Sequence, residues 1–87
     1  MINVVLSPAL VSLFPGAVHR VEVDAADVNA MIDALDARWP GMADRLRDSS
    51  PSVRRHINIF VDGKRATLDT PLAPGSPVYV LTAVSGG

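Results

Sequence analysis

The last two residues of the chain, Gly86 and Gly87, are the residues best suited to take part in chemistry. Because neither glycine has a side chain, the carboxylate of Gly87 could enter a tunnel that admits little more than main chain. A carboxylate presented in this way is a substrate. Val84, two residues before the glycines, is expected to dock in an apolar groove of a partner and to fix their register. The sequence therefore predicts a reactive terminus at Gly86 and Gly87, with Val84 and Ser85 as partner-binding residues.

No other set of residues predicts a catalytic or ligand site. The chain has no cysteine, which excludes disulfides, thiolate metal sites and a cysteine nucleophile. His19 and His56 have no metal-ligand spacing around them, and the sequence contains neither a Gly-rich phosphate loop nor a nucleophile-elbow serine. We expect no metal, no bound cofactor and no intrinsic enzymatic activity.

The composition is typical of one globular domain. The 87 residues are 48% hydrophobic and 20% charged, with eight Lys and Arg against nine Asp and Glu, a net charge of −1. This balance argues against nucleic acid as a partner, because such proteins carry a basic surface. No apolar run reaches the roughly 18 residues of a membrane helix. The apolar stretch from Pro8 to Val18 is similar to the core of a signal peptide, but no Lys or Arg precedes it and Pro8, Pro15 and Gly16 interrupt it, so a cytoplasmic location is expected.

One helix is strongly predicted. Apolar residues recur at helical spacing between Asp27 and Trp39, at Val28, Met31, Ile32, Leu35 and Trp39. Asp24 or Asp27 supplies the cap at its start, and Pro40-Gly41 ends it. Met42 and Leu46 suggest a further short turn of helix.

Strands are predicted on both sides of this helix. They are expected at Ile2–Leu6, Val18–Val23, Ile57–Val61, around Lys64 and Arg65, and at Val78–Thr82. The intervening segments 9–14, 48–52 and 68–77 are expected as connections, and Leu10, Leu13 and Phe14 of the first are expected to fold back on the core. The sequence thus predicts an α+β fold in which a mixed sheet of four or five strands packs on one main helix.

One face of this sheet is expected to remain uncovered. If Ile57, Ile59 and Val61 face the helix, Phe60 points to the opposite face. The two-residue turn Asp62-Gly63 then sets Phe60 opposite Arg65, which makes an apolar and cationic patch suited to partner docking. An exposed aromatic residue without a function is the simpler alternative.

The chain resembles the ubiquitin-like sulfur carriers of the ThiS/MoaD family, and is closest in character to its CysO-like or MoaD-like members. The resemblance covers nearly the whole chain. It is carried by the element order, by the segments 39–46 (WPGMADRL) and 56–63 (HINIFVDG), and by the final 83–87 (AVSGG). It implies a β-grasp domain over residues 1–82 followed by a flexible tail over 83–87.

The resemblance also implies a function as a protein cosubstrate. An ATP-dependent, ubiquitin-activating-like enzyme would adenylate the carboxylate of Gly87, and a sulfur donor would then displace AMP to leave a thiocarboxylate. This thiocarboxylate would donate its sulfur to a downstream synthase, of which the chain could be a small subunit. The implied partners are therefore the adenylating enzyme or sulfurtransferase and that synthase.

Several alternatives stay open at this point. Ser85 stands where molybdopterin carriers often have Thr and CysO-like carriers often have Ala, so the tail does not choose between a cysteine-type and a molybdopterin-type pathway. Thiamin-type or specialised thio-metabolite pathways also remain. Gly87 could instead form an isopeptide bond as a ubiquitin-like modifier, or the domain could be a non-covalent binding module that uses the open face around Phe60.

Overall fold

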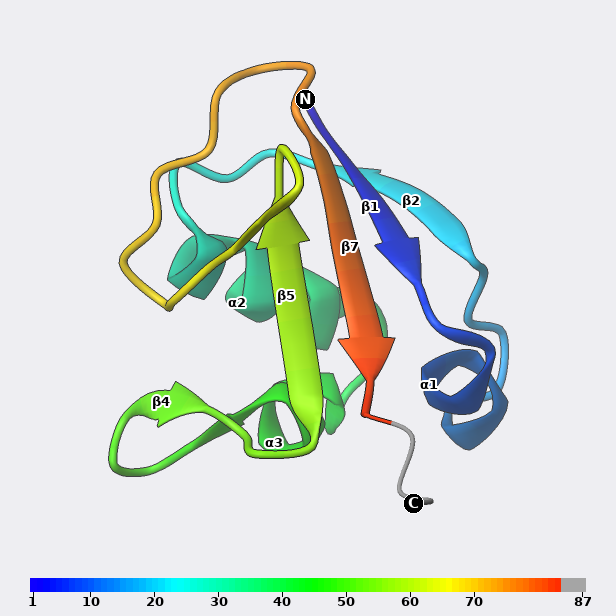
Figure 1. The fold of residues 1–87 in the computed structure, drawn as a ribbon. Coiled ribbons are helices and arrows are strands. Elements are labelled where there is room, and N and C mark those ends of the chain that lie inside the picture. Colours follow the sequence, from blue (N-terminus) through cyan, green and yellow to red (C-terminus); the bar gives the residue numbers. More distant parts are fainter. Residues whose placement is uncertain (84–87) are drawn as a thin grey trace.

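A five-stranded mixed sheet packed against one long helix forms the body of the protein in this computed structural model, which describes residues 1–83 (Figure 1). The strands of this sheet, in spatial order, are β2 (Arg20–Val23), β1 (Ile2–Leu6), β7 (Pro77–Thr82), β5 (Ile57–Val61) and β6 (Lys64–Arg65). The first and last strands, β1 and β7, are parallel neighbours at the centre, and the other pairs are antiparallel. The predicted α+β architecture, the β-grasp fold, is confirmed.

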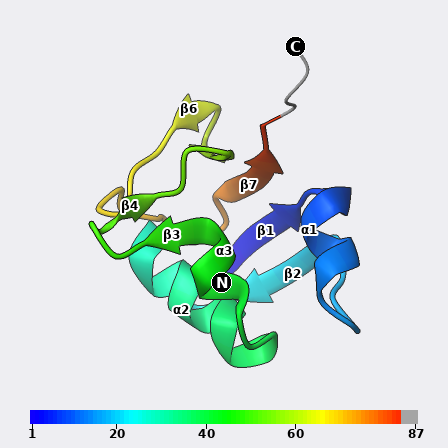
Figure 2. The ribbon, with the colours of Figure 1, turned by 90° about the horizontal axis from the view of Figure 1, so that it is seen from below.

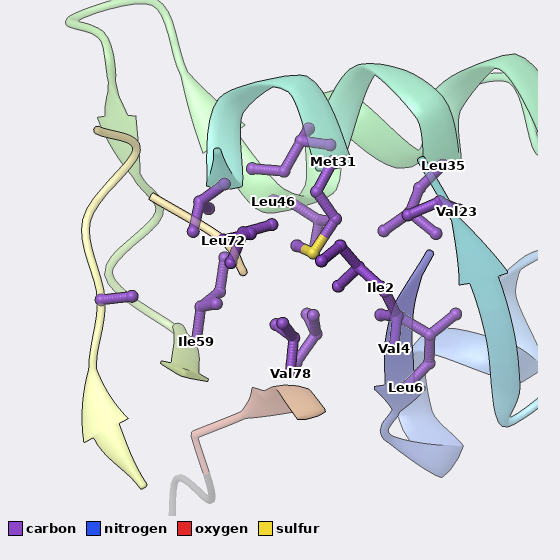
Figure 3. Packing of buried hydrophobic residues seen from close by; sticks show 14 of the residues in the cluster. Ile2, Val4, Leu6, Val23, Met31, Leu35, Leu46, Ile59, Leu72 and Val78 are labelled. Carbon is purple, nitrogen blue, oxygen red and sulfur yellow. The ribbon is translucent and has the colours of Figure 1, made fainter. Parts of the chain in front are cut away.

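The helix α2 (Val28–Arg38) covers one face of the sheet. Its cap is Asp27, whose side-chain Oδ1 accepts a 2.8 Å hydrogen bond from the main-chain N–H of Ala30. Four of the predicted stripe residues are fully buried: Val28, Met31, Ile32 and Leu35. Figure 3 shows Met31 and Leu35 directed toward the inward-facing residues of the strands. The core therefore lies between α2 and the sheet, as the periodicity predicts.

The segment expected as a connection after β1 is instead a helix, α1 (Pro8–Leu13). The Ser7 side chain accepts a hydrogen bond from the main-chain N–H of Leu10, and Pro8 occupies the first turn, where its fixed φ favours a helix. Leu10 is buried, as expected, and Phe14 packs partly against the core. The expectation for Leu13 is wrong, since its side chain is 51% exposed.

After α2 the chain forms a short helix and a small second sheet. Helix α3 (Met42–Leu46) buries both of its predicted apolar residues, Met42 and Leu46. The segment expected as a plain loop contains a two-stranded ladder of β3 (Arg47–Asp48) and β4 (Ser52–Val53). The Asp48 carboxylate closes this turn by accepting hydrogen bonds from the main-chain N–H groups of Ser50 and Ser52.

The β5–β6 hairpin turns at Asp62 and Gly63 with positive φ at both residues, 52° and 81°, which is the backbone of the predicted type I′ turn. β7 begins one residue earlier than predicted, at Pro77, and β2 begins two residues later, at Arg20. No helix among residues 1–83 is long and apolar enough to cross a membrane.

Candidate functional site

The end of β7 is where the described chain leads to the predicted reactive terminus. The main-chain N–H of Ala83 donates a 2.7 Å hydrogen bond to the carbonyl oxygen of His56, the residue before β5. Figure 2 shows the molecule from below, so that β7 runs toward the viewer. The predicted site residues Val84, Ser85, Gly86 and Gly87 lie outside the described residues, so their roles stay predictions.

The sheet face opposite α2 carries a row of side chains that crosses all five strands. Phe60 pairs with Arg65 on one side and with Tyr79 on the other, Tyr79 pairs with Val5, and Val5 pairs with Arg20. Paired residues in neighbouring strands point to the same face, so the row presents three apolar side chains between two arginines. We call these five residues the open-face row; Figure 1 views the sheet from this side.

The predicted opposition of Phe60 and Arg65 is therefore present, and the patch around Phe60 is larger than predicted. Tyr79 is 44% exposed, and Leu81, one pleat further along β7, is 37% exposed. The sequence holds the signal for both, because Val78 and Val80 alternate with them and are buried. Exposed apolar side chains that adjoin in this way are more typical of an interaction surface than isolated ones.

The Arg65 side chain makes one hydrogen bond to another side chain within residues 1–83. One of its guanidinium nitrogens, Nη2, donates to Oδ1 of Asn58, which holds the side chain over β5. The ion pair between Arg47 and Asp33 is the one salt bridge within residues 1–83, so no described carboxylate lies within 4.0 Å of Arg65. A guanidinium has five donors, and those left over suit carboxylates of a docking protein.

The two histidines do not come together. Nδ1 of His19 lies 3.4 Å from the carbonyl oxygen of Leu6, while His56 is exposed beside Ala83. Within residues 1–83 no three His, Asp or Glu side chains gather as a metal site. Among the described residues, the candidate site therefore has two parts: the open-face row, which crosses β7 at Tyr79, and the end of β7 at Thr82 and Ala83.

A protein-family model agrees with this architecture over most of the chain. The model of the ThiS family matches residues 9–87, which include all of α1 but its first residue, together with α2, the hairpin and the final glycines. This match covers far more than half of the chain.

Three relatives support the same assignment. The sulfur carrier protein CysO of Mycobacterium tuberculosis is 34% identical over 92 residues, which cover 98% of this chain and 99% of that protein. Small archaeal modifier protein 1 of Haloferax volcanii is 33% identical over 69 residues, which cover 78% of this chain and 79% of that protein. A chain in the crystal structure of the Amycolatopsis orientalis BexX/CysO complex superposes with a TM-score of 0.86 at 26% identity, with 100% of both chains covered. The chain belongs to the ThiS family of ubiquitin-like sulfur carriers.

Proposed function

We propose that the carboxylate of Gly87 is activated and then carries sulfur. In the first step a carboxylate oxygen attacks the α-phosphorus of ATP on an adenylating enzyme, which forms the acyl adenylate and releases pyrophosphate. In the second step a sulfide anion (HS⁻) attacks the acyl carbon, AMP leaves, and loss of the proton gives the thiocarboxylate. Adenylation is needed because a free carboxylate is a poor electrophile, whereas AMP is a good leaving group.

The observation that carries this proposal is the family match, which extends from α1 to Gly87. The chain that leads to Gly87 also starts from a fixed point, the hydrogen-bonded end of the sheet at Ala83. Four residues follow Ala83, and at 3.3 to 3.6 Å each they extend at most roughly 14 Å. That distance allows Gly87 to enter an enzyme while the folded domain stays outside. In this scheme the chain is a cosubstrate, not a catalyst, and ATP belongs to the activating enzyme.

The acceptor pathway is proposed from the relatives. Similarity to a sulfur carrier named CysO over nearly the full length favours a cysteine-type pathway, with a molybdopterin-type pathway as the alternative. The BexX/CysO complex supports the expectation that a chain of this fold binds a partner protein, and we propose that this partner is a sulfur-accepting synthase. We place these reactions in the cytoplasm.

A second candidate function rests on the archaeal relative. Because one relative is named a small archaeal modifier protein, Gly87 could be transferred to a lysine amine of a target protein instead of to sulfur. Both functions share the adenylate and differ in the nucleophile that displaces AMP.

An intact mass measurement tests the proposal. The purified protein is incubated with its cognate adenylating enzyme, ATP and sulfide, and the mass is expected to rise by the difference between sulfur and oxygen, within the peptide that ends in Gly87. A chain that lacks Gly86 and Gly87 serves as the control. An unchanged mass, with an enzyme that modifies another carrier in the same assay, would contradict the sulfur-carrier function; conjugates that contain Gly87 would favour the modifier.

A further inference from the structure

A groove of about 760 Å³ adjoins the end of β7 on the side away from the open-face row. Its walls come from α1, from α3 and from the residues that precede β5, and Thr82 and Ala83 complete it. Figure 2 shows α1 and α3 from the end of the molecule where this groove lies. We call it the α1–α3 groove, defined by Leu13, Phe14, Arg45, Arg54, Ile57 and Ala83.

The apolar part of the groove is only partly covered by the fold. Leu10 and Ile57 are buried beneath it, at 1% and 5% exposure, whereas Leu13 is 51% exposed at its rim. The two exposed apolar side chains of β7, Tyr79 and Leu81, lie on the opposite face of the sheet. Leu13 is therefore a separate exposed apolar side chain, and it lines the same groove as Thr82 and Ala83 at the end of β7.

The start of α3, which forms one wall of the groove, is held in place by hydrogen bonds from its main chain. Gly41 starts α3 with a φ of +99°, and a Cβ on it would lie 3.4 Å from Cε1 of Phe14. The Asp36 carboxylate accepts 3.0 Å hydrogen bonds from the main-chain N–H groups of Gly41 and Ala43. The two hydrogen bonds hold the start of α3 against α2, so this wall of the groove is formed before a partner arrives.

The polar rim of the groove is predominantly cationic. Arg45 and Arg54 both line it, and Nε of Arg54 donates to the main-chain carbonyl of Asp44. The Asp44 carboxylate is the one acidic side chain among the lining residues, and within residues 1–83 no carboxylate lies within 4.0 Å of either guanidinium. An occupant that matches this rim brings carboxylates together with an apolar side chain.

The position of Ala83 identifies which protein can occupy the groove. Gly87 lies at most roughly 14 Å from Ala83 along the extended chain, so an enzyme that holds Gly87 must bring its surface against the end of β7. We propose that the α1–α3 groove binds the adenylating enzyme, which inserts an apolar side chain flanked by carboxylates between Leu13 and Arg45. This inference rests on the proposed function and adds a second contact surface, separate from the open-face row.

The experiment uses the adenylating enzyme from the same organism as the probe. Its Kd is measured by calorimetry for the chain that lacks Gly86 and Gly87, so that docking is separated from chemistry. Leu13→Asp and Arg45→Glu are each expected to raise the Kd by about tenfold, the effect of losing one well-packed or charge-matched interface residue. Val18→Asp is the matched control for Leu13→Asp because Val18 is 49% exposed but does not line the groove. Arg38→Glu is the control for Arg45→Glu because Arg38 is also exposed and does not line the groove.

Each outcome decides the inference. Because Leu13 is exposed, Leu13→Asp is expected to leave the Tm unchanged, and methyl NMR spectra check that its fold is intact. Equal Kd values for Leu13→Asp, Val18→Asp and the unsubstituted chain would overturn the groove. Leu13 methyl signals that shift on deletion of Gly86 and Gly87, but not on addition of enzyme, would show that the groove holds the chain's own end and would also overturn it.

The proposed function is tested separately, with the same enzyme and the full chain. ATP–pyrophosphate exchange with the full chain reports adenylation of Gly87. Exchange together with a Kd that does not depend on Leu13 means that the groove inference fails alone. A Kd that depends on Leu13 without exchange means that the proposed function fails alone, and the absence of both binding and exchange contradicts both.

Discussion

The main-chain amide of Ala83 is hydrogen-bonded to the carbonyl of His56, at 2.7 Å, so the sheet pairing of β7 with the chain entering β5 continues to the last described residue. Ala83 is therefore the fixed point from which the maximum length of residues 84–87 is counted. His56 and Ala83 both line the α1–α3 groove, whereas the open-face row crosses β7 at Tyr79 on the other side of the sheet. Under the proposals above, a protein that binds Gly87 would have these two different surfaces of the domain to contact.

Gly87→Ala is expected to abolish activation and to leave the fold unchanged. The added methyl group lies beside the reacting carboxylate, and a misplacement of about 1 Å can cost about a hundredfold in rate. ATP–pyrophosphate exchange measures activation, and thermal unfolding measures the fold. Ala73→Ser, an exposed change far from the terminus, is the control. Normal adenylation of Gly87→Ala would contradict the idea of a tunnel that admits only main chain.

Phe60→Ala is expected to weaken partner binding by about tenfold, since truncation of a central aromatic residue at an interface commonly costs this much or more. Calorimetry with the adenylating enzyme measures the Kd. Because Phe60 is partly buried, thermal unfolding checks that the variant remains folded. Glu22→Ala is the control, because Glu22 lies on the same sheet face but at its outer strand. A Kd unchanged by Phe60→Ala would reduce the residue to an ordinary exposed aromatic.

Asp27→Ala is expected to destabilise the domain by about 1 kcal/mol, because it removes the hydrogen bond to the N–H of Ala30 at the start of α2. For a domain of this size the Tm should fall by about 4–8 °C. Asp24→Ala is the matched control, since Asp24 precedes the helix without capping it. Equal Tm values for the two variants would contradict the cap seen at Asp27.

The β3–β4 turn is expected to respond to acid. Hydrogen bonds from the hydroxyl and then the main-chain N–H of Ser50, together with those from Ser52, hold the pKa of Asp48 below its ordinary value of 3.8. With a lowered folded pKa, the stabilisation is fully present above pH 3.8 and is lost as the pH falls through the lower value. The amide NMR signals of Ser50 and Ser52 should therefore shift with a midpoint below pH 3.8.

Asp48→Asn should remove this shift, whereas Asp69→Asn, at an exposed acidic residue outside this turn, should preserve it. A midpoint at or above pH 3.8 in the unsubstituted protein would show that the turn does not favour the charged form of Asp48.

Much of this fold can be predicted from the sequence because the signals for helices and tight turns lie within a few consecutive residues. The apolar spacing from Val28 to Leu35 predicts α2, and Asp62-Gly63 predicts the hairpin that sets Phe60 opposite Arg65. Helix α1 was missed because its apolar residues are too few to show a period, although Ser7-Pro8 is a recognisable start signal.

The order of the five main strands around α2, the buried face of α2 and the family of the chain follow from the sequence, whereas α1 and the β3–β4 ladder do not. The three-dimensional structure was needed to show that Val5 and Tyr79 join Phe60 in one row, and that Leu13 is exposed in the groove that Ala83 also lines. The physical reason is that these neighbours come from strands and helices far apart in the chain. Their contact depends on the pairing register of β1, β7 and β5, which the shared core fixes only when the whole sheet has formed.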